Sequence, residues 1–547
     1  MRSKRVLSAV AVAAIAGLVV TACGSGDGGD SGSDGNGELN LSLGEPANLV
    51  PPNVGETEGG EIVRMTYSGL YNYANDGTLA EVIAAGQPST TDNKVWTIKL
   101  NTGFKFQNGE EINADLFKKS WDFAAYGPNA NGGGYFFSRI DGYADMQSTD
   151  PDGEEGPKKA PEPKAKELTG VKVVDPTTIE ITLTDPWVGF PTMLGYTAFY
   201  PTAEACRTAV DACNEAPIGN GAFKIVGKWE HDSAIKLERW DEYTGAKPEY
   251  KNLNYKIYTG QSNCWADFEA GTIDICAPTP DAYLGAKDTY GSKMIEAPSP
   301  STWSLGYPVY DDIFKDVKVR QAFSQAINRQ EIIDAIFQGQ GKPLDTFTPE
   351  MIPGYKAGTA AAYTTFDATA AKALLDSSSW PKGKKVELWI NSGSTGETIL
   401  KAIGDQLSKN LGLEYELKTL EWPQFLQKKT DHELTGPFFT GWAPDYALSQ
   451  NYMGPLYASI AGNGSDNDFG YFNQSFEDAL AAGDQSATLP EAIVQYQAAE
   501  AILGEDLPVA PLFTRMTSTV IGDKLDFDSV DRNPILGEID LIKLKLA

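Results

Sequence analysis

The chain has 547 residues and a formal net charge of -29. This length exceeds what one hydrophobic core supports, so we expect two or three domains. The acidic balance argues against a nucleic-acid-binding protein, because such proteins need a basic face toward the phosphates. An acidic surface otherwise indicates solubility and does not identify a binding partner.

Residues 1–22 have the pattern of a secretory signal peptide. They begin with basic residues, continue with a short apolar run rich in Ala and Val, and end in Thr21-Ala22 before Cys23. A short run with this basic flank predicts a secretory signal and not a membrane span. The small residues before Cys23 resemble a bacterial lipobox, which implies cleavage there and acylation of the thiol, for example with palmitate. The alternative is a buried cysteine at the end of an anchor helix.

Residues 23–37 predict a flexible tether, because Gly, Ser and Asp dominate the segment. Gly29-Asp30-Ser31-Gly32 looks like the nucleophile motif of a serine protease. A structureless tether cannot hold a histidine against that serine, so we exclude this interpretation. The tether fits an extracellular domain that stands off a membrane on a lipid.

Four further cysteines support export from the cell, since an even number outside the cell suggests disulfides. Proximity in the sequence favours Cys206 with Cys213 and Cys264 with Cys276, although four cysteines allow three pairings. A zinc site is the alternative, but these spacings do not resemble a Cys-x-x-Cys site.

The first half of the mature chain alternates mostly between short strands and helices. A Gly-rich turn at 218–222 leads into a strand, whereas a phosphate-binding loop would lead into a helix. Residues 148–167 are polar and predict a solvated surface loop. The other expected elements are strands at 39–43, 95–100, 103–109, 171–174, 178–183, 235–240 and 273–275, and helices at 62–71, 116–123 (capped by Asn113) and 264–270.

The second half contains the clearest helical pattern, residues 317–336, in which Asn328 is expected to cap a second helix. A strand, a helix and a strand then follow one another at 386–420, which predicts a parallel α/β unit. The expected elements are helices at 368–375, 398–411 and 490–503, and strands at 386–390, 413–420, 507–513 and 541–546.

Phe438–Tyr457 is rich in aromatic residues and contains one acidic residue, Asp445, but no basic residue. A carboxylate among so many rings is costly unless a cation meets it. One interpretation is a turn, since Pro-Asp pairs often start loops and Asp hydrogen-bonds its own backbone. The other interpretation is a binding site for a cationic group.

Five groups of residues carry a resemblance to a known family. They are Tyr67-Ser68-Gly69-Leu70 with Asp76-Gly77; Trp96 to Gly109 with Ala114-Asp115; Gly219 to Lys224 with Arg239-Trp240; Val319 to Phe323 with Ala326 to Arg329; and Gly441-Trp442 with Asp445-Tyr446. In this order they resemble the bacterial extracellular solute-binding proteins of family 5, which serve dipeptide and oligopeptide ABC importers. The resemblance runs from about Leu39 to the C-terminus.

The resemblance implies an α/β, two-lobed fold of the periplasmic-binding-protein (Venus flytrap) type with an extra small subdomain. The ligand would be enclosed between the lobes, with its main chain paired to protein backbone. The implied division is residues 38–78, 190–297 and 508–547 for lobe I, 79–189 for the small subdomain, and 298–507 for lobe II.

The resemblance also implies the ligand-binding residues. Asp445 matches the carboxylate that holds the α-ammonium group of a peptide. The other matches are the backbone of Gly441, Trp442 and Ala443, the edge segment with Glu45 and Ala47, a pocket residue Trp422, a basic residue Lys429 near the carboxylate end, and Tyr135 from the small subdomain. Trp422 could instead be an ordinary core residue, and Lys429 a solvated surface residue. Phe439 stands where some members carry an Arg, and Pro444 beside Asp445 is a second departure.

The sequence therefore predicts a monomeric receptor that captures extracellular peptide and delivers it to the permease of an ABC importer. It would sit on the outer face of the membrane and need no cofactor. The alternative is the same fold with another solute, such as an oligosaccharide or a metal chelate. Only His231 and His432 are available for metal or haem. We predict no enzyme, because no catalytic triad or Gly-x-Ser-x-Gly motif is found.

Overall fold

The computed structural model describes residues 37–148, 159–392, 395–459 and 467–547. The predicted signal peptide, Cys23 and nearly all of the tether lie outside the described residues, as does part of the predicted loop at 148–167. Within the described part, no helix is both long and apolar enough to span a membrane.

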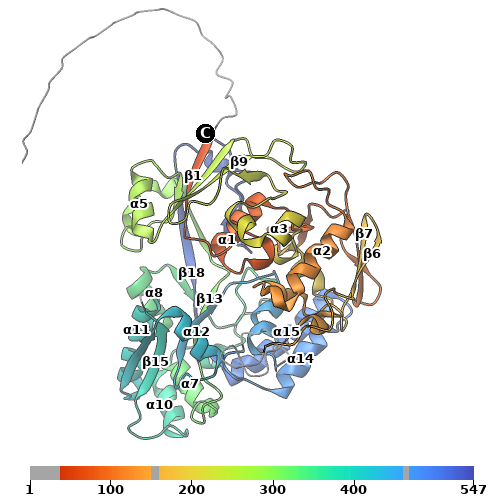
Figure 1. Ribbon diagram of the computed structural model, residues 1–547. Helices are drawn as coiled ribbons and strands as arrows, with labels where there is room; N and C mark the ends of the chain where they lie inside the picture. The colour runs from red at the N-terminus through yellow and green to blue at the C-terminus, as the bar shows by residue number, and fades with distance from the viewer. Residues whose placement is uncertain (1–36, 149–158, 393–394, 460–466) are drawn as a thin grey trace, which may run out of the picture.

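A twelve-stranded sheet, here called the central sheet, runs through the molecule (Figure 1). Two of its strands, β12 (Met294–Pro298) and β14 (Gly341–Pro343), pair with β18 beside the main path. Along that path the spatial order is β16 (Tyr415–Leu420), β15 (Val386–Asn391), β17 (Phe438–Trp442), β13 (Thr302–Gly306), β18 (Val509–Ile521), β11 (Ile275–Cys276), β1 (Glu38–Leu43), β10 (Asn252–Ile257), β9 (Ala234–Arg239) and β8 (Phe223–Ile225).

β18 connects the two halves of the central sheet. Its residues 509–515 pair with β13 and β14, and its residues 516–521 pair with β12 and β11. Figure 1 shows β18 as a long strand that passes from the level of β13 to the level of β1. We call the half with β1, β8–β11 lobe I and the half with β13, β15–β17 lobe II. The boundary expected at 507/508 therefore falls at the start of a strand that both lobes share.

Each lobe has its own buried apolar core. In lobe I, Leu39, Leu41 and Tyr255 of the sheet pack in one cluster with Ile62 of α1 (Thr57–Thr66). The other lobe I helices are α3 (Glu204–Thr208), α4 (Val210–Glu215), α5 (Gln261–Glu269) and α6 (Tyr283–Tyr290). In lobe II the sheet packs against α7 (Val317–Gln325), α8 (Arg329–Phe337), α10 (Ala368–Asp376) and α11 (Thr395–Leu411).

A separate four-stranded sheet forms the small subdomain, together with α2 (Ala114–Ala125). Its strands are, in order, β4 (Ser89–Thr90), β5 (Val95–Lys99), β7 (Thr178–Thr182) and β6 (Val171–Asp175). Asn113 caps α2 as predicted, since its side chain accepts from Leu116 N at 3.0 Å.

The small subdomain packs on two helices of lobe II, α14 (Gln474–Asp484) and α15 (Leu489–Asp506) (Figure 1). The indole of Trp187 donates to Tyr496 Oη at 3.3 Å, and the Arg139 guanidinium pairs with Asp484 at 2.9 Å. One buried cluster includes Trp187, Tyr446 and Tyr496, so the core of the small subdomain is continuous with this part of lobe II.

Most predicted elements are present. The helical pattern at 317–336 forms α7 and α8, and Asn328 caps α8 by accepting from Glu331 N at 3.2 Å. β15 and β16 are parallel and are joined through α11, as the strand-helix-strand pattern predicts. The remaining elements are β2 (Tyr71–Tyr73), β3 (Leu79–Glu81), β19 (Arg532–Asn533), β20 (Glu538–Ile539), α9 (Ala361–Thr364), α12 (Trp422–Thr430) and α13 (Gly454–Tyr457).

Three predicted elements are wrong. At 103–109 there is only a bridge between Lys105 and Glu111, because Gly103 and Gly109 take left-handed backbone angles (φ 91° and 89°) that interrupt a strand. The helix expected over 62–71 ends at Thr66, and its last apolar residues enter β2. At 541–546 the alternating apolar residues reach the lobe I core, but the backbone makes one bridge only.

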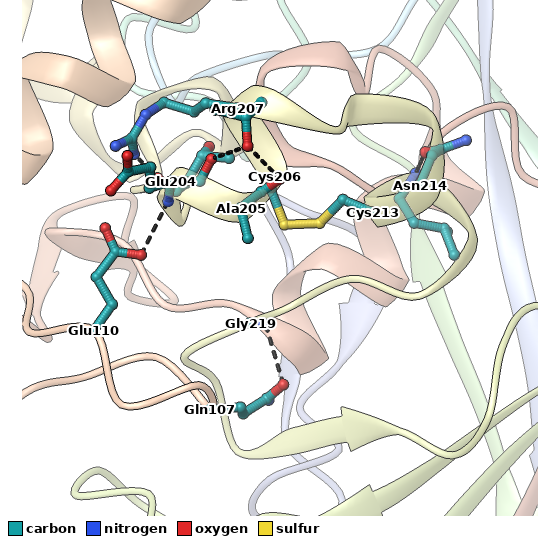
Figure 2. Close-up of a disulfide and its surroundings, with 12 residues drawn as sticks. Gln107, Glu110, Glu204, Ala205, Cys206, Arg207, Cys213, Asn214 and Gly219 are labelled. Atoms are coloured by element: carbon teal, nitrogen blue, oxygen red, sulfur yellow. Dashed lines mark hydrogen bonds between the residues drawn. A yellow bond between two sulfur atoms is a disulfide. The ribbon is translucent and has the colours of Figure 1, made fainter.

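The two disulfides that proximity favours are present, Cys206–Cys213 and Cys264–Cys276. Figure 2 shows the first, which joins the short helices α3 and α4. Nearby, Glu110 accepts from Glu204 N at 2.9 Å and ties α3 to the small subdomain. The zinc alternative does not hold, because all four sulfur atoms are used in disulfides.

Candidate functional site

Asp445 lies just beyond the end of β17, where the chain leaves the central sheet. Gly441 and Ala443 are exposed there, and Pro444 restricts Ala443 to an extended backbone. Extended backbone therefore continues past the strand up to the half-buried Asp445.

The amide of Asn451 fixes the position of Asp445. Asn451 is fully buried, its Oδ1 accepts from Asp445 N at 2.9 Å, and its Nδ2 donates to Asp445 Oδ2 at 3.0 Å. The same Oδ1 accepts from Trp442 Nε1 at 3.1 Å. Sequence reasoning missed Asn451, whose only local signal is its place in the aromatic run. Asn451 thus sets the orientation of both Asp445 and Trp442.

Asp445 lines the first cavity, about 330 Å³ in volume, which lies between the small subdomain and lobe II. Tyr135, Phe136 and Tyr143 contribute from the small subdomain, and Tyr446 from lobe II. Its charged lining residues are Asp185, Asp445, Glu477, Asp484 and Arg139. Since the Arg139 guanidinium already pairs with Asp484 and stacks on Trp187 at 4.3 Å, the first cavity favours a cation.

The tyrosines around Asp445 show how little water screens its charge. Burial raises the pKa of Tyr196 and of Tyr452, and in both cases the negative charge of Asp445 raises it further. Burial likewise raises the pKa of Tyr73, with Tyr200 and then Asp445 adding to the effect. A carboxylate in such surroundings attracts a cation more strongly than one in bulk water.

The second cavity, about 340 Å³ in volume, lies in lobe II where β15 and β17 separate. The two strands share one register pair, Trp389 with Phe438. Beyond it, both strands line this cavity through Ile390, Asn391, Phe439, Thr440 and Gly441. The rest of its wall is formed by Trp303, Phe337, Thr395, Gly396, Ile399, Trp422, Phe425, Lys429 and Arg515.

Trp422 and Lys429, both on α12, line the second cavity but differ in exposure. Trp422 is 53% exposed and stacks on Phe425, so it is not an ordinary core residue. The Lys429 side chain is only 17% exposed, and its ammonium pairs with Asp468 at 2.7 Å. Lys429 is therefore not a solvated surface residue, and its charge is already neutralised.

The structure places Glu45 and Ala47 apart from both cavities, among whose lining residues neither is found. The amide of Ala47 donates to Glu56 at 2.8 Å. The Glu45 carboxylate accepts from Asp232 N at 3.0 Å and meets His231 Nδ1 at 2.9 Å, while His231 Nε2 meets Glu215 at 2.9 Å. His231 thus links the segment after β1 to the end of α4.

We expect His231 to titrate above the ordinary histidine value, because hydrogen bonds to Glu215 and then Glu45 raise its pKa. A raised folded-state pKa stabilises the protein below the unfolded value, and this stability is lost as pH rises through the folded pKa. The thermal stability lost in His231→Gln should therefore be larger at about pH 5.5 than at about pH 8.5. Proton NMR of the two histidines, with His231→Gln for assignment, gives the pKa, and a value at or below 6.5 would contradict this expectation.

No group of three or more His, Cys, Asp or Glu side chains that could hold a metal is found in the described part of the chain. A two-lobed α/β fold whose lobes share one long strand is typical of extracytoplasmic solute-binding proteins. Residues 79–464 match the bacterial extracellular solute-binding proteins, family 5 Middle, and the chain belongs to this family. The family and the fold class predicted from the sequence are therefore confirmed.

Relatives and solved structures agree with this assignment over nearly the whole chain. The chain is 25% identical over 536 residues to the oligopeptide-binding protein OppA of Bacillus subtilis, which covers 93% of this chain and 94% of the relative. The murein tripeptide binding protein MppA of Escherichia coli has a similar fold, with a TM-score of 0.76, 21% identity, and coverage of 93% and 98%. Haemophilus influenzae OppA, in complex with the peptide RPPGFSPFR, gives a TM-score of 0.75, 19% identity, and coverage of 94% and 99%.

Proposed function

We propose that this protein is the peptide receptor of an ABC importer. The observation that carries the proposal is the Asp445 carboxylate, held by Asn451 in a first cavity that favours a cation. The α-ammonium group of a peptide supplies such a cation. Relatives named for binding oligopeptides and murein peptides support the same choice of solute.

Backbone pairing with β17 would hold the main chain of the ligand. One edge of β17 pairs with β13 over residues 438–442, while the other pairs with β15 at Phe438 alone. The described residues thus leave an open strand edge at 439–442, beside the second cavity. An extended peptide can add to such an edge without any demand on its side chains. Gly441, Trp442 and Ala443 are the proposed pairing residues, and Tyr135 packs against the ligand from the small subdomain.

Closure of the two lobes around β18 would exclude water from the bound peptide. Water exclusion strengthens every polar contact in the site, including the one to Asp445. The loaded receptor then docks on the transmembrane subunits of its permease. The name of one protein with a similar fold supports this step: it is the ABC transporter substrate-binding protein CtaP of Listeria monocytogenes, with a TM-score of 0.77. Catalysis has no part in this proposal.

We further propose that the receptor is a monomeric lipoprotein on the outer face of the membrane. The lipobox-like sequence before Cys23 and the Gly/Ser/Asp tether support an anchor at that thiol. A lipid anchor keeps a receptor close to its permease while the tether lets it move. Cys23, Asp445 and the pairing backbone are thus the residues on which capture and delivery depend.

A requirement for a free α-amine separates peptides from the other solutes that this fold can hold. We expect calorimetry to detect binding of short peptides and a loss of at least about tenfold in affinity when the same peptides are N-acetylated, because acetylation removes the charge that Asp445 meets. Oligosaccharides should produce no thermal shift. Equal binding of free and acetylated peptides, or a shift with sugars alone, would contradict the proposal and favour the alternative solute.

A further inference from the structure

Arg515 lies in the wall of the second cavity, and the fold does little to neutralise its positive charge. It lies on β18 at the last position that pairs with β14, where the strand passes from lobe II to lobe I. Its guanidinium lies 5.0 Å from the ring centre of Phe337. Among the described residues, no carboxylate pairs with it and it donates no side-chain hydrogen bond, so its fork of N–H donors is available.

Two buried arginines of lobe II, Arg320 and Arg329, show what a structural arginine does in this fold, whereas Arg515 is half-buried. Arg329 donates to the carbonyl oxygens of Pro511 and Thr364, each at 2.7 Å, and to further oxygens nearby. Arg320 donates to Leu507 O at 3.0 Å and to other carbonyls. Their donors are satisfied by the protein itself, whereas those of Arg515 face a cavity. Burial lowers the pKa of Arg515, and among the described residues no acidic side chain pairs with its guanidinium.

The two cavities carry opposite charges. In the first cavity, four carboxylates face one arginine, which Asp484 already neutralises. In the second cavity the charged lining residues are Lys429 and Arg515, and none of the described residues that line it is acidic. Because Lys429 pairs with Asp468, the uncompensated charge of the second cavity is that of Arg515.

The strand register brings Arg515 close to the backbone edge proposed to pair with the ligand. Trp303 of β13 lies between Gly441 of β17 and Phe513 of β18. Arg515 follows Phe513 by two positions and therefore shares its face of the sheet. A ligand that lies along the open edge of β17 is thus three strand spacings from β18, about 14 Å in the plane of the sheet, and the Arg515 side chain lines the same cavity as Gly441.

We propose that Arg515 binds the terminal carboxylate of the peptide in the second cavity, opposite the ammonium site at Asp445. This inference rests on the proposed function. A guanidinium binds a carboxylate through two parallel hydrogen bonds, and the remaining wall is aromatic and aliphatic, which suits a desolvated ion pair. The receptor would then select short peptides with both ends free.

The test compares a peptide acid with its C-terminal amide. A library of three- to five-residue peptides is screened on the full chain by native mass spectrometry, and the best binder is made in both forms. Calorimetry on the unaltered protein should show the amide binding about tenfold to a hundredfold more weakly, the effect of losing a charge-assisted hydrogen bond. In Arg515→Met the two forms should bind equally, and Arg515→Lys should restore part of the preference.

Lys342→Met is the matched control, because Lys342 lies on the neighbouring strand β14, pairs with Glu350 and lines neither cavity. It should keep the full preference for the acid. Equal binding of acid and amide to the unaltered protein would overturn the proposed role of Arg515 but leave the proposed function as a peptide receptor intact. This comparison uses the unaltered protein alone, so it does not depend on whether a variant folds. An unchanged preference in Arg515→Met overturns it as well. Failure of every peptide to bind overturns the proposed function and this inference with it.

Discussion

Replacing Asp445 by asparagine is expected to weaken peptide binding by well over tenfold. Asparagine keeps the shape of the side chain and an oxygen that can accept from Asn451 Nδ2, so the local fold should survive. The negative charge is lost, however, and removing one partner of a buried, hydrogen-bonded charge pair costs about 2–5 kcal/mol. Isothermal calorimetry with an unmodified peptide measures the effect.

Asp376→Asn provides the control for the loss of one negative charge. Asp376 ends α10, is exposed and pairs with Lys372 on the same helix, away from both cavities. Its substitution should leave affinity within about twofold of the unaltered protein, since surface ion pairs contribute little. If Asp445→Asn binds peptide as well as Asp376→Asn does, Asp445 does not hold the ammonium group.

Replacing Arg329 by methionine is expected to destabilise lobe II without touching the ligand site. Arg329 is 4% exposed, and its guanidinium donates to Pro511, Thr364, Ser324 and Ile327. Methionine fills similar space but removes the guanidinium donors from these buried oxygens, of which Ser324 O still accepts from Ile327 N at 3.2 Å. Each unsatisfied group costs about 1–3 kcal/mol, partly offset by removing a desolvated charge, so we expect a net loss of about 3–5 kcal/mol. Urea unfolding measures this free energy.

Arg532→Met is the comparison for this second prediction. Arg532 makes one side-chain hydrogen bond, to Thr517 Oγ1 at 2.9 Å, so its loss should cost about 1 kcal/mol. Peptide affinity should be unchanged in the folded fraction of both variants, because neither arginine lines a cavity. A stable Arg329→Met protein with reduced affinity would reverse the assignment and make Arg329 a functional residue.

Local signals predicted much of the fold from the sequence. Asn113 and Asn328 cap the helices that they precede, because a cap depends on residues within one turn. The pattern at 386–420 predicted the parallel pair β15 and β16 through the periodicities of strand and helix. Proximity in the sequence was also enough for both disulfides.

Contacts between distant residues account for what the sequence did not reveal. The 541–546 segment alternates like a strand, yet among the described residues it makes only the bridge between Leu546 and Leu525. The sharing of β18 between the lobes depends on pairing with segments more than 150 residues earlier. No local sequence pattern marks Arg515 as a binding residue, and its position in the wall of the second cavity follows only from the path of β18.

The residues of the candidate site likewise divide into those that the sequence identifies and those whose role depends on the fold. Asp445 was identifiable because the sequence around it contains no basic residue and resembles a family motif. The role of Asn451 depends on the backbone path between it and Asp445, which composition does not encode. For Lys429 the decisive fact is its partner Asp468, which lies 39 residues further along the chain and enters only through the fold.

Native mass spectrometry of the purified full chain tests the central claim most directly, because receptors that enclose their solute often retain it. We predict that the protein carries a population of added mass that fragments into short peptides with free amino and carboxyl termini. Asp445→Asn should lose this population, and Asp376→Asn should keep it. Bound mass that resolves into a sugar or a metal chelate, or peptides that remain equally bound to Asp445→Asn, would contradict the account.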